Sequence, residues 1–352
     1  MKIVHIDFTG TFNETMSYQE NIIPKYNAKD GHEVIMITTC YEWDNEGKVI
    51  YSPSVDKMMG NGVRLIRLEY VKIINKFITS KIRRVNNFYM LLKQLCPDII
   101  FVHGLQTFEL LTVVKYIKRN PLKKLLIDNH ADFSNSASNI LSKYILHKII
   151  WRYFANYAEP YTSKFYGVLP ARVDFLINIY KLPRNKCELL LMGADDEKVF
   201  MSRNSNIRQQ IRNELGISES DFLIITGGKI DIEKKQTITL LRAIHELNIP
   251  NVKLLLFGSI IKELKKEIDQ FVDNKRIHYI GWINSEDVYN YFVASELAIF
   301  PGRHSVLWEQ AVGTGIPCIF KYRIGTTHVD VSGNCKFLYS DQVEEIKTIP
   351  FI

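Results

Sequence analysis

The residue types most able to do chemistry lie in one short segment, residues 300–320 (FPGRHSVLWEQAVGTGIPCIF). Its polar members stand between two apolar runs: Gly302, Arg303, His304, Ser305 and Glu309. Pro301 excludes a regular helix or strand at the start, and Gly313 ends a helix-compatible stretch. The pattern therefore predicts a strand, a turn, a short helix over 306–312 and a second strand over 316–320.

A glycine-containing turn in this position is a favourable place for an anion. In an open α/β sheet, ligands bind at the carboxyl ends of the strands, where free N–H groups and the helix dipole converge. We therefore expect the backbone of 302–305 to cradle a phosphate. Such turns are common in α/β domains, so Glu309, one helical turn into the helix, is what makes this turn informative.

A second segment places cations at the end of another predicted strand. Residues 222–228 (FLIITGG) form an apolar run that ends in a glycine pair, and Lys229 follows directly. Lys235 comes six residues later, where an amphipathic helical stretch begins. Gly228 lets a bulky anion approach the backbone, and two lysines at one sheet edge suit a diphosphate. The competing interpretation is a pair of solvated surface lysines.

The order of these motifs resembles glycosyltransferase family 4, whose members are retaining enzymes with two Rossmann-like domains, the GT-B fold. The second half contributes the strand-Gly-Lys segment, KLLLFG, RIHYIGW and SELAIFPG followed by WEQAVGTGIPCI. The first half contributes GHEV, PDIIFVHGL, LLIDNH and LMGADDEKVF. The resemblance extends from Lys2 to about Phe337. Each motif is weak alone, but together and in order they are specific.

This resemblance implies an α/β chain with an acceptor-side domain over residues 1–192 and a nucleotide-sugar domain over 193–352. A length of 352 residues suits two domains of ordinary size. Residues 41–62 are expected to form a long loop or irregular hairpin, and residues 135–157 one or two helices. Family members continue past the second sheet with further helices, so the helix-poor tail predicts a shortened closing element. The strands expected in the first half are 2–6, 33–39, 63–68, 98–103, 124–128 and 165–169.

The resemblance also implies roles for individual residues in donor binding. Glu309 matches the second Glu of the family's Glu-x7-Glu motif, which accepts hydrogen bonds from ribose hydroxyls. The first Glu of that motif falls at Pro301 and is absent. Lys229 and Lys235 match the cations that neutralise the leaving diphosphate, and the amide of Gly10 would add to the phosphate cradle.

His130 ends the LLIDNH strand and matches a histidine that the family places near the donor sugar and the reacting centre. A satisfied structural histidine is the alternative. The mechanism implied is transfer with retention, in which a diphosphate oxygen takes the acceptor's proton on the same face. No protein nucleophile, metal or other cofactor is then expected, and the sequence contains neither HExxH nor Asp-x-Asp.

The predicted function is transfer of a sugar from a nucleotide-diphosphate sugar to a saccharide or lipid-linked acceptor, in capsule, lipopolysaccharide or exopolysaccharide synthesis. The alternative is a non-catalytic or degenerate nucleotide-sugar binder, suggested by the missing Glu at Pro301. A Rossmann dehydrogenase is disfavoured because no GxGxxG follows the first strand.

The net charge of +7 is uneven, because residues 64–93 carry eight cations and one acid among apolar residues. Such a segment suits an anionic membrane surface, and a solvated helix face is the alternative. Nucleic acid is disfavoured because no binding module surrounds it. The scattered cysteines, the missing secretory pattern and the lack of an 18-residue apolar run predict a cytoplasmic protein, peripheral at the inner face of the cell membrane.

Overall fold

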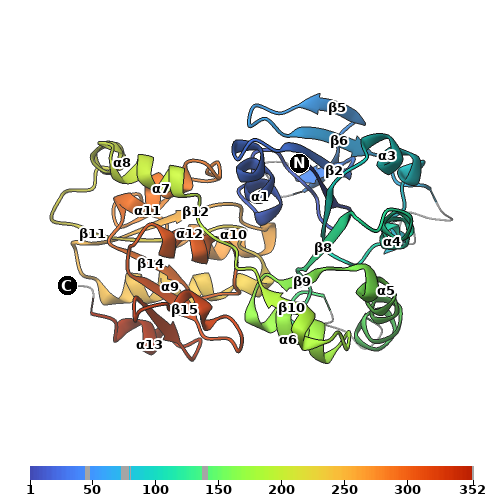
Figure 1. Cartoon of the computed structure of the whole chain (residues 1–352). Helices are drawn as coiled ribbons and strands as arrows, with labels where there is room; N and C mark the ends of the chain where they lie inside the picture. The colour runs from blue at the N-terminus through green and yellow to red at the C-terminus, as the bar shows by residue number, and fades with distance from the viewer. Residues whose placement is uncertain (44–47, 73–78, 80, 137–141, 351–352) are drawn as a thin grey trace. The chain divides into compact units, whose positions relative to one another are not determined.

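A computed structural model describes residues 1–43, 48–72, 79, 81–136 and 142–350. The chain divides into two compact units. Apart from two short segments in the first half of the chain, the first unit runs to Leu191 and the second begins at Met192. Each unit is built on a largely parallel sheet with helices packed on it (Figure 1).

The first unit contains an eight-stranded sheet in the order β10-β9-β8-β7-β1-β2-β6-β5. Its strands are β1 Lys2–Asp7, β2 Glu33–Thr39, β5 Val55–Met58, β6 Arg64–Leu68, β7 Ile99–His103, β8 Lys124–Asn129, β9 Lys164–Gly167 and β10 Cys187–Leu189. All neighbours pair in parallel except β5, which runs antiparallel to β6 at the edge. The strand order changes direction between β1 and β7, the type of position where open α/β sheets bind ligands.

Helices cover this sheet, which explains why its strands are nearly continuous apolar runs. The helical elements are α1 Gln19–Lys29, α3 Phe88–Leu95, α4 Glu109–Arg119, the π-helix η1 Ser142–Trp151, α5 Arg152–Ala158 and α6 Pro170–Asn178. α4 shows the pattern well, because Leu110, Val113, Val114 and Ile117 are buried on its inner side while its last turn is basic.

The second unit contains a six-stranded parallel sheet in the order β13-β12-β11-β14-β15-β16. Its strands are β11 Phe222–Gly227, β12 Val252–Phe257, β13 Ile277–Tyr279, β14 Leu297–Phe300, β15 Cys318–Lys321 and β16 Cys335–Leu338. Its α-helices are α7 Asp196–Arg203, α8 Ile207–Glu214, α9 Gln236–Leu247, α10 Lys262–Asp269, α11 Val288–Ala294, α12 Leu307–Gly313 and α13 Val343–Lys347. Here the order changes direction between β11 and β14.

The strands and the short helix predicted from sequence are confirmed with shifts of one or two residues at their ends. Residues 41–62, expected to form a long loop or irregular hairpin, contain a hairpin: β3 Tyr41–Trp43 pairs with β4 Val49–Tyr51, and β5 joins the main sheet. The tail expected to be poor in helix is residues 347–352, and α13, which packs against α9, ends at the first of them, Lys347. Of the helical stretch expected at 135–157, residues 137–141 lie outside the described residues, and η1 and α5 follow.

Not every cation of the basic segment 64–93 lies on an exposed face, and its contact with a membrane stays a prediction. Arg67 on β6 is only 1% exposed. Its guanidinium donates to the Glu42 carboxylate at 2.9 Å and to the carbonyls of Phe12 and Thr39 at 3.2 Å. Residues 73–78 and 80 lie outside the described part of the chain. No helix in that described part is long and apolar enough to cross a bilayer.

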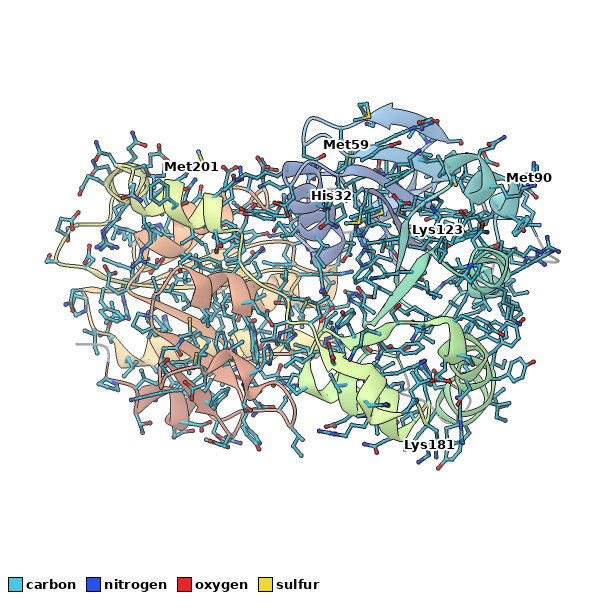
Figure 2. All side chains as sticks on the ribbon, in the orientation of Figure 1. His32, Met59, Met90, Lys123, Lys181 and Met201 are labelled. Atoms are coloured by element: carbon cyan, nitrogen blue, oxygen red, sulfur yellow. The ribbon has the colours of Figure 1, made fainter. Side chains whose placement is uncertain are left out.

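Surface charges elsewhere in the first unit are paired in the ordinary way. Lys123 (Figure 2), just before β8, forms an ion pair with Asp98 at 2.8 Å at the amino edge of the sheet. Arg64 pairs with Asp56 at 2.7 Å on the exposed edge strands. Exposed pairs of this kind contribute little to stability, because solvent screens them.

Arg67→Gln should lower the free energy of unfolding of the first unit by about 3 kcal/mol, because it leaves Glu42 and two carbonyls without their cationic partner. The matched control is Arg64→Gln on the same strand, for which a loss below about 1 kcal/mol is expected. Urea unfolding followed by tryptophan fluorescence measures both. Equal losses in the two variants would contradict a structural role for the buried Arg67.

Candidate functional site

Sequence-predicted donor residues gather at the carboxyl edge of the second sheet, where its strand order changes direction. β11 ends there and continues into Gly228 and Lys229, and β14 ends there and continues into Pro301 and Gly302. β11 and β14 are hydrogen-bonded neighbours, so the two turns lie side by side. Gly228 has φ +104°, a conformation that side chains with a Cβ rarely adopt.

Lys234, rather than the predicted Lys235, lies between these two turns. A Cβ built on Gly302 would come within 3.0 Å of the Lys234 Cα, and one on Gly228 would lie 3.4 Å from the Lys234 Nζ. Lys234 is half-buried, whereas its neighbour Lys235 is exposed. Lys234 and Lys235 are adjacent at the start of a helix, so sequence spacing alone does not show which of them lies between the two turns. The signal available in the sequence was Gly302, which has no side chain and so leaves room for a lysine.

Three cations converge around this point. Burial, together with the charges of Arg303 and Lys229, lowers the pKa of Lys234 to about 8 against the opposing effect of Asp231. Lys234 is therefore a group that is only partly protonated near neutral to mildly alkaline pH. Repulsion among the three cations is relieved when an anion binds between them, which suits a phosphate or diphosphate.

Glu309 on α12 forms the polar centre of the same edge. The carboxylate is 7% exposed, and its Oε1 accepts hydrogen bonds from Nε2 of His304 and Nε2 of His328, both at 2.8 Å. Burial raises the pKa of Glu309, but the two hydrogen bonds and the imidazole charges outweigh it and lower the pKa below its usual value. Glu309 is thus an ionised, buried carboxylate held through one oxygen.

The other oxygen of Glu309 and several nearby polar atoms have no partner within the described residues. These buried atoms are Glu309 Oε2, His328 Nδ1, Trp308 Nε1 and Ser305 Oγ. The Trp308 ring stacks on Phe320 with 4.3 Å between centroids, which fixes its orientation. Leaving a buried polar atom unpaired costs about 1–3 kcal/mol, so such a group indicates a polar ligand. A ligand with hydroxyl groups can donate to the carboxylate and accept from an N–H.

The donor atoms of His304, Glu309 and His328 lie within 4.8 Å of one another, as do those of His103, Asp128 and His130. Two histidines and a carboxylate are a ligand set that zinc accepts. In both groups the same atoms already form hydrogen bonds or ion pairs with one another. Shared protons therefore account for these contacts without an ion, and metal independence stays a prediction.

In the first unit, a chain of imidazoles ends at His130. Asn27 Nδ2 lies 3.0 Å from His5 Nε2, His5 Nδ1 lies 3.0 Å from His103 Nε2, and His103 Nδ1 lies 2.7 Å from Asp128 Oδ2. His130 Nε2 lies 3.1 Å from the other oxygen, Asp128 Oδ1. One tautomer pattern satisfies His5 and His103: each neutral imidazole donates through Nδ1 and accepts at Nε2. The ion pair of His130 with Asp128 instead requires a proton on His130 Nε2, because a carboxylate oxygen only accepts.

The charges along this chain are set by burial and by Asp128. Burial, and then the charge of His103, lower the pKa of His5 well below its usual value. Burial raises the pKa of Asp128, but the charges of His130 and His103 outweigh it and hold that pKa well below its usual range. Burial lowers the pKa of His130, yet the Asp128 charge raises it overall. His130, whose side chain is 31% exposed, is thus the group that can hold a proton for a ligand.

The predicted role of Gly10 meets a competing contact. Its amide donates to Asp7 Oδ1 at 2.9 Å, and the Thr9 amide donates to the same oxygen at 3.0 Å. The loop after β1 therefore wraps around the Asp7 carboxylate. The amide that was assigned to phosphate is already engaged, and a ligand would have to displace Asp7 to use it.

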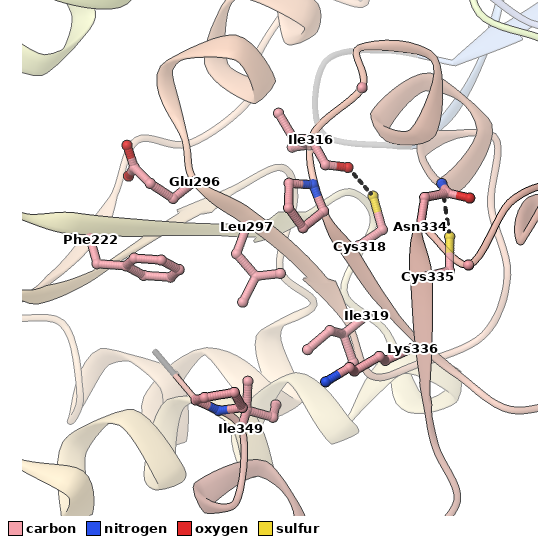
Figure 3. A pocket seen from close by; sticks show the side chains of 14 residues that line it. Phe222, Glu296, Leu297, Ile316, Cys318, Ile319, Asn334, Cys335, Lys336 and Ile349 are labelled. Atoms are coloured by element: carbon pink, nitrogen blue, oxygen red, sulfur yellow. Dashed lines mark hydrogen bonds between the residues drawn. The ribbon is translucent and has the colours of Figure 1, made fainter. Parts of the chain in front are cut away.

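A cavity of about 450 Å³ opens at the opposite, amino ends of the second sheet (Figure 3). Leu297, Cys318 and Cys335 line it from the starts of β14, β15 and β16. Both cysteine Sγ atoms donate to backbone carbonyls, and burial raises the pKa of each thiol. The cavity is mostly apolar and contains none of the sequence-predicted donor residues.

Comparison with known proteins finds a family match that lies within the second unit. Residues 207–319 match the family model described as Glycosyl transferases group 1, a range that includes β11, β14 and Glu309. No curated protein matches the chain by sequence.

Several solved structures share the fold. HepE from Anabaena in complex with UDP is 15% identical, with TM-score 0.67, and the match covers 99% of this chain and 88% of that one. WaaG, a glycosyltransferase involved in lipopolysaccharide biosynthesis, is 15% identical, with TM-score 0.65 and coverage of 98% and 88%. UDP-GlcNAc 2-epimerase from Neisseria meningitidis bound to UDP-GlcNAc is 13% identical, with TM-score 0.61 and coverage of 99% and 89%. These identities show the fold alone, and the fold is GT-B, as predicted.

Asp128→Asn should lower the pKa of His130, because the carboxylate charge that opposes the effect of burial is removed. Titration of the His130 ring protons by NMR measures the shift. Asp98→Asn is the matched control, since Asp98 lies at the other end of β7 and pairs with Lys123. A His130 pKa that is unchanged in Asp128→Asn would contradict the assignment of Asp128 as its partner.

Proposed function

We propose that the chain is a retaining glycosyltransferase of the family 4 type that acts at the cytoplasmic face of the cell membrane. It moves a sugar from a nucleotide-diphosphate sugar to a saccharide or lipid-linked acceptor in capsule, lipopolysaccharide or exopolysaccharide synthesis. One observation carries the proposal: Glu309 is buried and ionised with Oε2 unpartnered, on the sheet edge where three cations converge. A polyol joined to a diphosphate suits this pairing of an acceptor with cations.

In this proposal the two halves of the donor meet different groups. The ribose hydroxyls donate to Glu309 Oε2, because both imidazole N–H groups already occupy Oε1. The diphosphate lies among Lys229, Lys234 and Arg303. The UDP and UDP-GlcNAc in the complexes of similar fold support a nucleotide-sugar ligand.

The reaction follows from the same groups. The bond between the anomeric carbon and the diphosphate oxygen breaks, and charge accumulates on that oxygen. The lysines and Arg303 stabilise this charge more strongly in the transition state than in the bound donor. The acceptor hydroxyl attacks the same face and passes its proton to the diphosphate. His130 takes its role near the sugar from the resemblance.

A non-catalytic nucleotide-sugar binder is the alternative, and Pro301 favours it because the first Glu of the family motif is absent. The two functions separate when the chain is incubated with UDP-, GDP- and dTDP-sugars and the products are analysed. A transferase should release free nucleoside diphosphate slowly by hydrolysis, and faster with a lipid-linked saccharide fraction. Tight binding with no product in either condition would support the binder, and an epimerised nucleotide sugar would contradict both.

Glu309→Ala should weaken UDP binding by about 1.5–3 kcal/mol, because the ribose loses a charged hydrogen-bond acceptor. Inorganic pyrophosphate is the matched ligand, since it keeps the diphosphate and lacks the ribose. Its affinity should be the same in the variant and in the wild type. Calorimetry measures both ligands. If pyrophosphate and UDP weaken equally, Glu309 supports the phosphate region and does not bind the ribose.

Lys234→Ala should weaken both UDP and pyrophosphate by about 1.5–3 kcal/mol, whereas Lys235→Ala should change neither by more than about twofold. The wild-type affinity for UDP should fall about tenfold from pH 7 to 9, because Lys234 loses its proton as the pH rises through its pKa of about 8. Lys234→Arg keeps its charge and should remove that pH dependence. A larger loss in Lys235→Ala than in Lys234→Ala would restore the assignment made from sequence.

A further inference from the structure

An exposed face of apolar and cationic side chains runs along η1 and α5 in the first unit. We call it the η1–α5 face, and its members are Tyr144, Ile145, Lys148, Ile149, Arg152, Tyr153 and Tyr157. Ile149 is 63% exposed and Tyr153 is 64% exposed. Ile145, Ile149, Tyr153 and Tyr157 recur every four residues, so they follow one side of the helical segment.

The fold does not need this face for its own packing. The opposite side of the same segment carries His147, Trp151, Phe154, Ala155 and Ala158, all of which are buried. α5 packs against α4 (Figure 1). The segment therefore has an inner apolar side that anchors it and an outer apolar side that contacts solvent. Large exposed apolar side chains gathered on one face mark an interaction surface.

The charge of the segment indicates the partner. Residues 142–158 contain two lysines and one arginine, and they contain no Asp or Glu. The Lys148 ammonium lies 4.4 Å from the Tyr144 ring centroid, and Lys118 of α4 lies 4.5 Å from the ring of Tyr157. Tyrosine and isoleucine interspersed with lysine and arginine are typical of helices that lie in the interface of an anionic bilayer.

We propose that the η1–α5 face binds the surface of an anionic lipid bilayer, with the apolar side chains in the headgroup region and the cations on lipid phosphates. A second copy of the chain is a poorer occupant, because a symmetric contact would bring Lys148 and Arg152 against like charges. The proposal does not depend on glycosyl transfer. It also assigns the membrane to a different element from residues 64–93.

Co-sedimentation with vesicles of phosphatidylcholine and phosphatidylglycerol tests the proposal. The wild type should bind at low salt and be largely released at high salt. Ile149→Asp with Tyr153→Asp should lower the partition coefficient at least tenfold. Lys148→Gln with Arg152→Gln should lower it about 25-fold at low salt, at about fivefold for each charge near the surface. Ile149, Arg152 and Tyr153 are exposed and Lys148 is half-buried, so the variants should keep the wild-type circular dichroism and UDP affinity.

Two controls make the outcome specific. Met201→Asp on α7 changes a side chain of matched exposure, 64%, in the second unit (Figure 2), and it should leave vesicle binding unchanged. Lys81→Gln with Arg84→Gln tests the basic segment, and binding should again persist. Three results would overturn the proposal: wild-type protein that ignores anionic vesicles at low salt, binding that survives both η1–α5 variants, or a dimer in light scattering that Ile149→Asp dissociates.

Discussion

The change in strand order beside the first strand of each parallel sheet is the constraint on which the rest of this structure depends. The helices that connect parallel strands on one side of that first strand pack on one face of the sheet. The helices that connect strands on its other side pack on the opposite face. Between β11 and β14, and again between β1 and β7, the connections leave in opposite directions. The turns there have no helix crossing over them. A Cβ on Gly302 would meet Lys234 at 3.0 Å, and one on Gly228 would lie 2.8 Å from Leu307 Cδ1 and 3.4 Å from Lys234 Nζ.

The carboxyl edge of each sheet contains a buried carboxylate, and the two carboxylates are stabilised in the same way. A buried carboxylate is costly unless charge or hydrogen bonds compensate for lost solvation. Asp128 in the first unit and Glu309 in the second are each compensated by two imidazoles. In both cases the compensation outweighs burial and lowers the pKa of the acid. Each edge therefore keeps a fixed negative charge beside two imidazoles.

The cationic side of the second edge is balanced differently. Lys234 is held near Arg303 and Lys229 although burial and repulsion both lower its pKa. Such an arrangement costs stability in the free protein and is relieved by a bound anion, which makes the site selective for charged ligands. The buried Arg67 in the first unit shows the contrast, because its partners come from the protein itself and leave it no part in binding.

Local pattern determined the elements of this protein. Apolar runs that end at or near glycine specify β11, β12 and β14, because a parallel strand covered on both faces needs a continuous apolar run and a turn residue at its end. The same turns located Gly228, Gly302 and Glu309 from the sequence.

Tertiary packing decided what lies beside them. Lys234 and Lys235 are adjacent in sequence, and the contact with Gly302 distinguishes the half-buried Lys234 from the exposed Lys235. His328 joins Glu309 from a turn 19 residues away, which no local spacing encodes. The buried state of Arg67 depends on partners from Phe12, Thr39 and Glu42, and the exposed η1–α5 face depends on which side of the segment the core covers. Sequence periodicity identifies an apolar face but does not state whether the protein itself buries it.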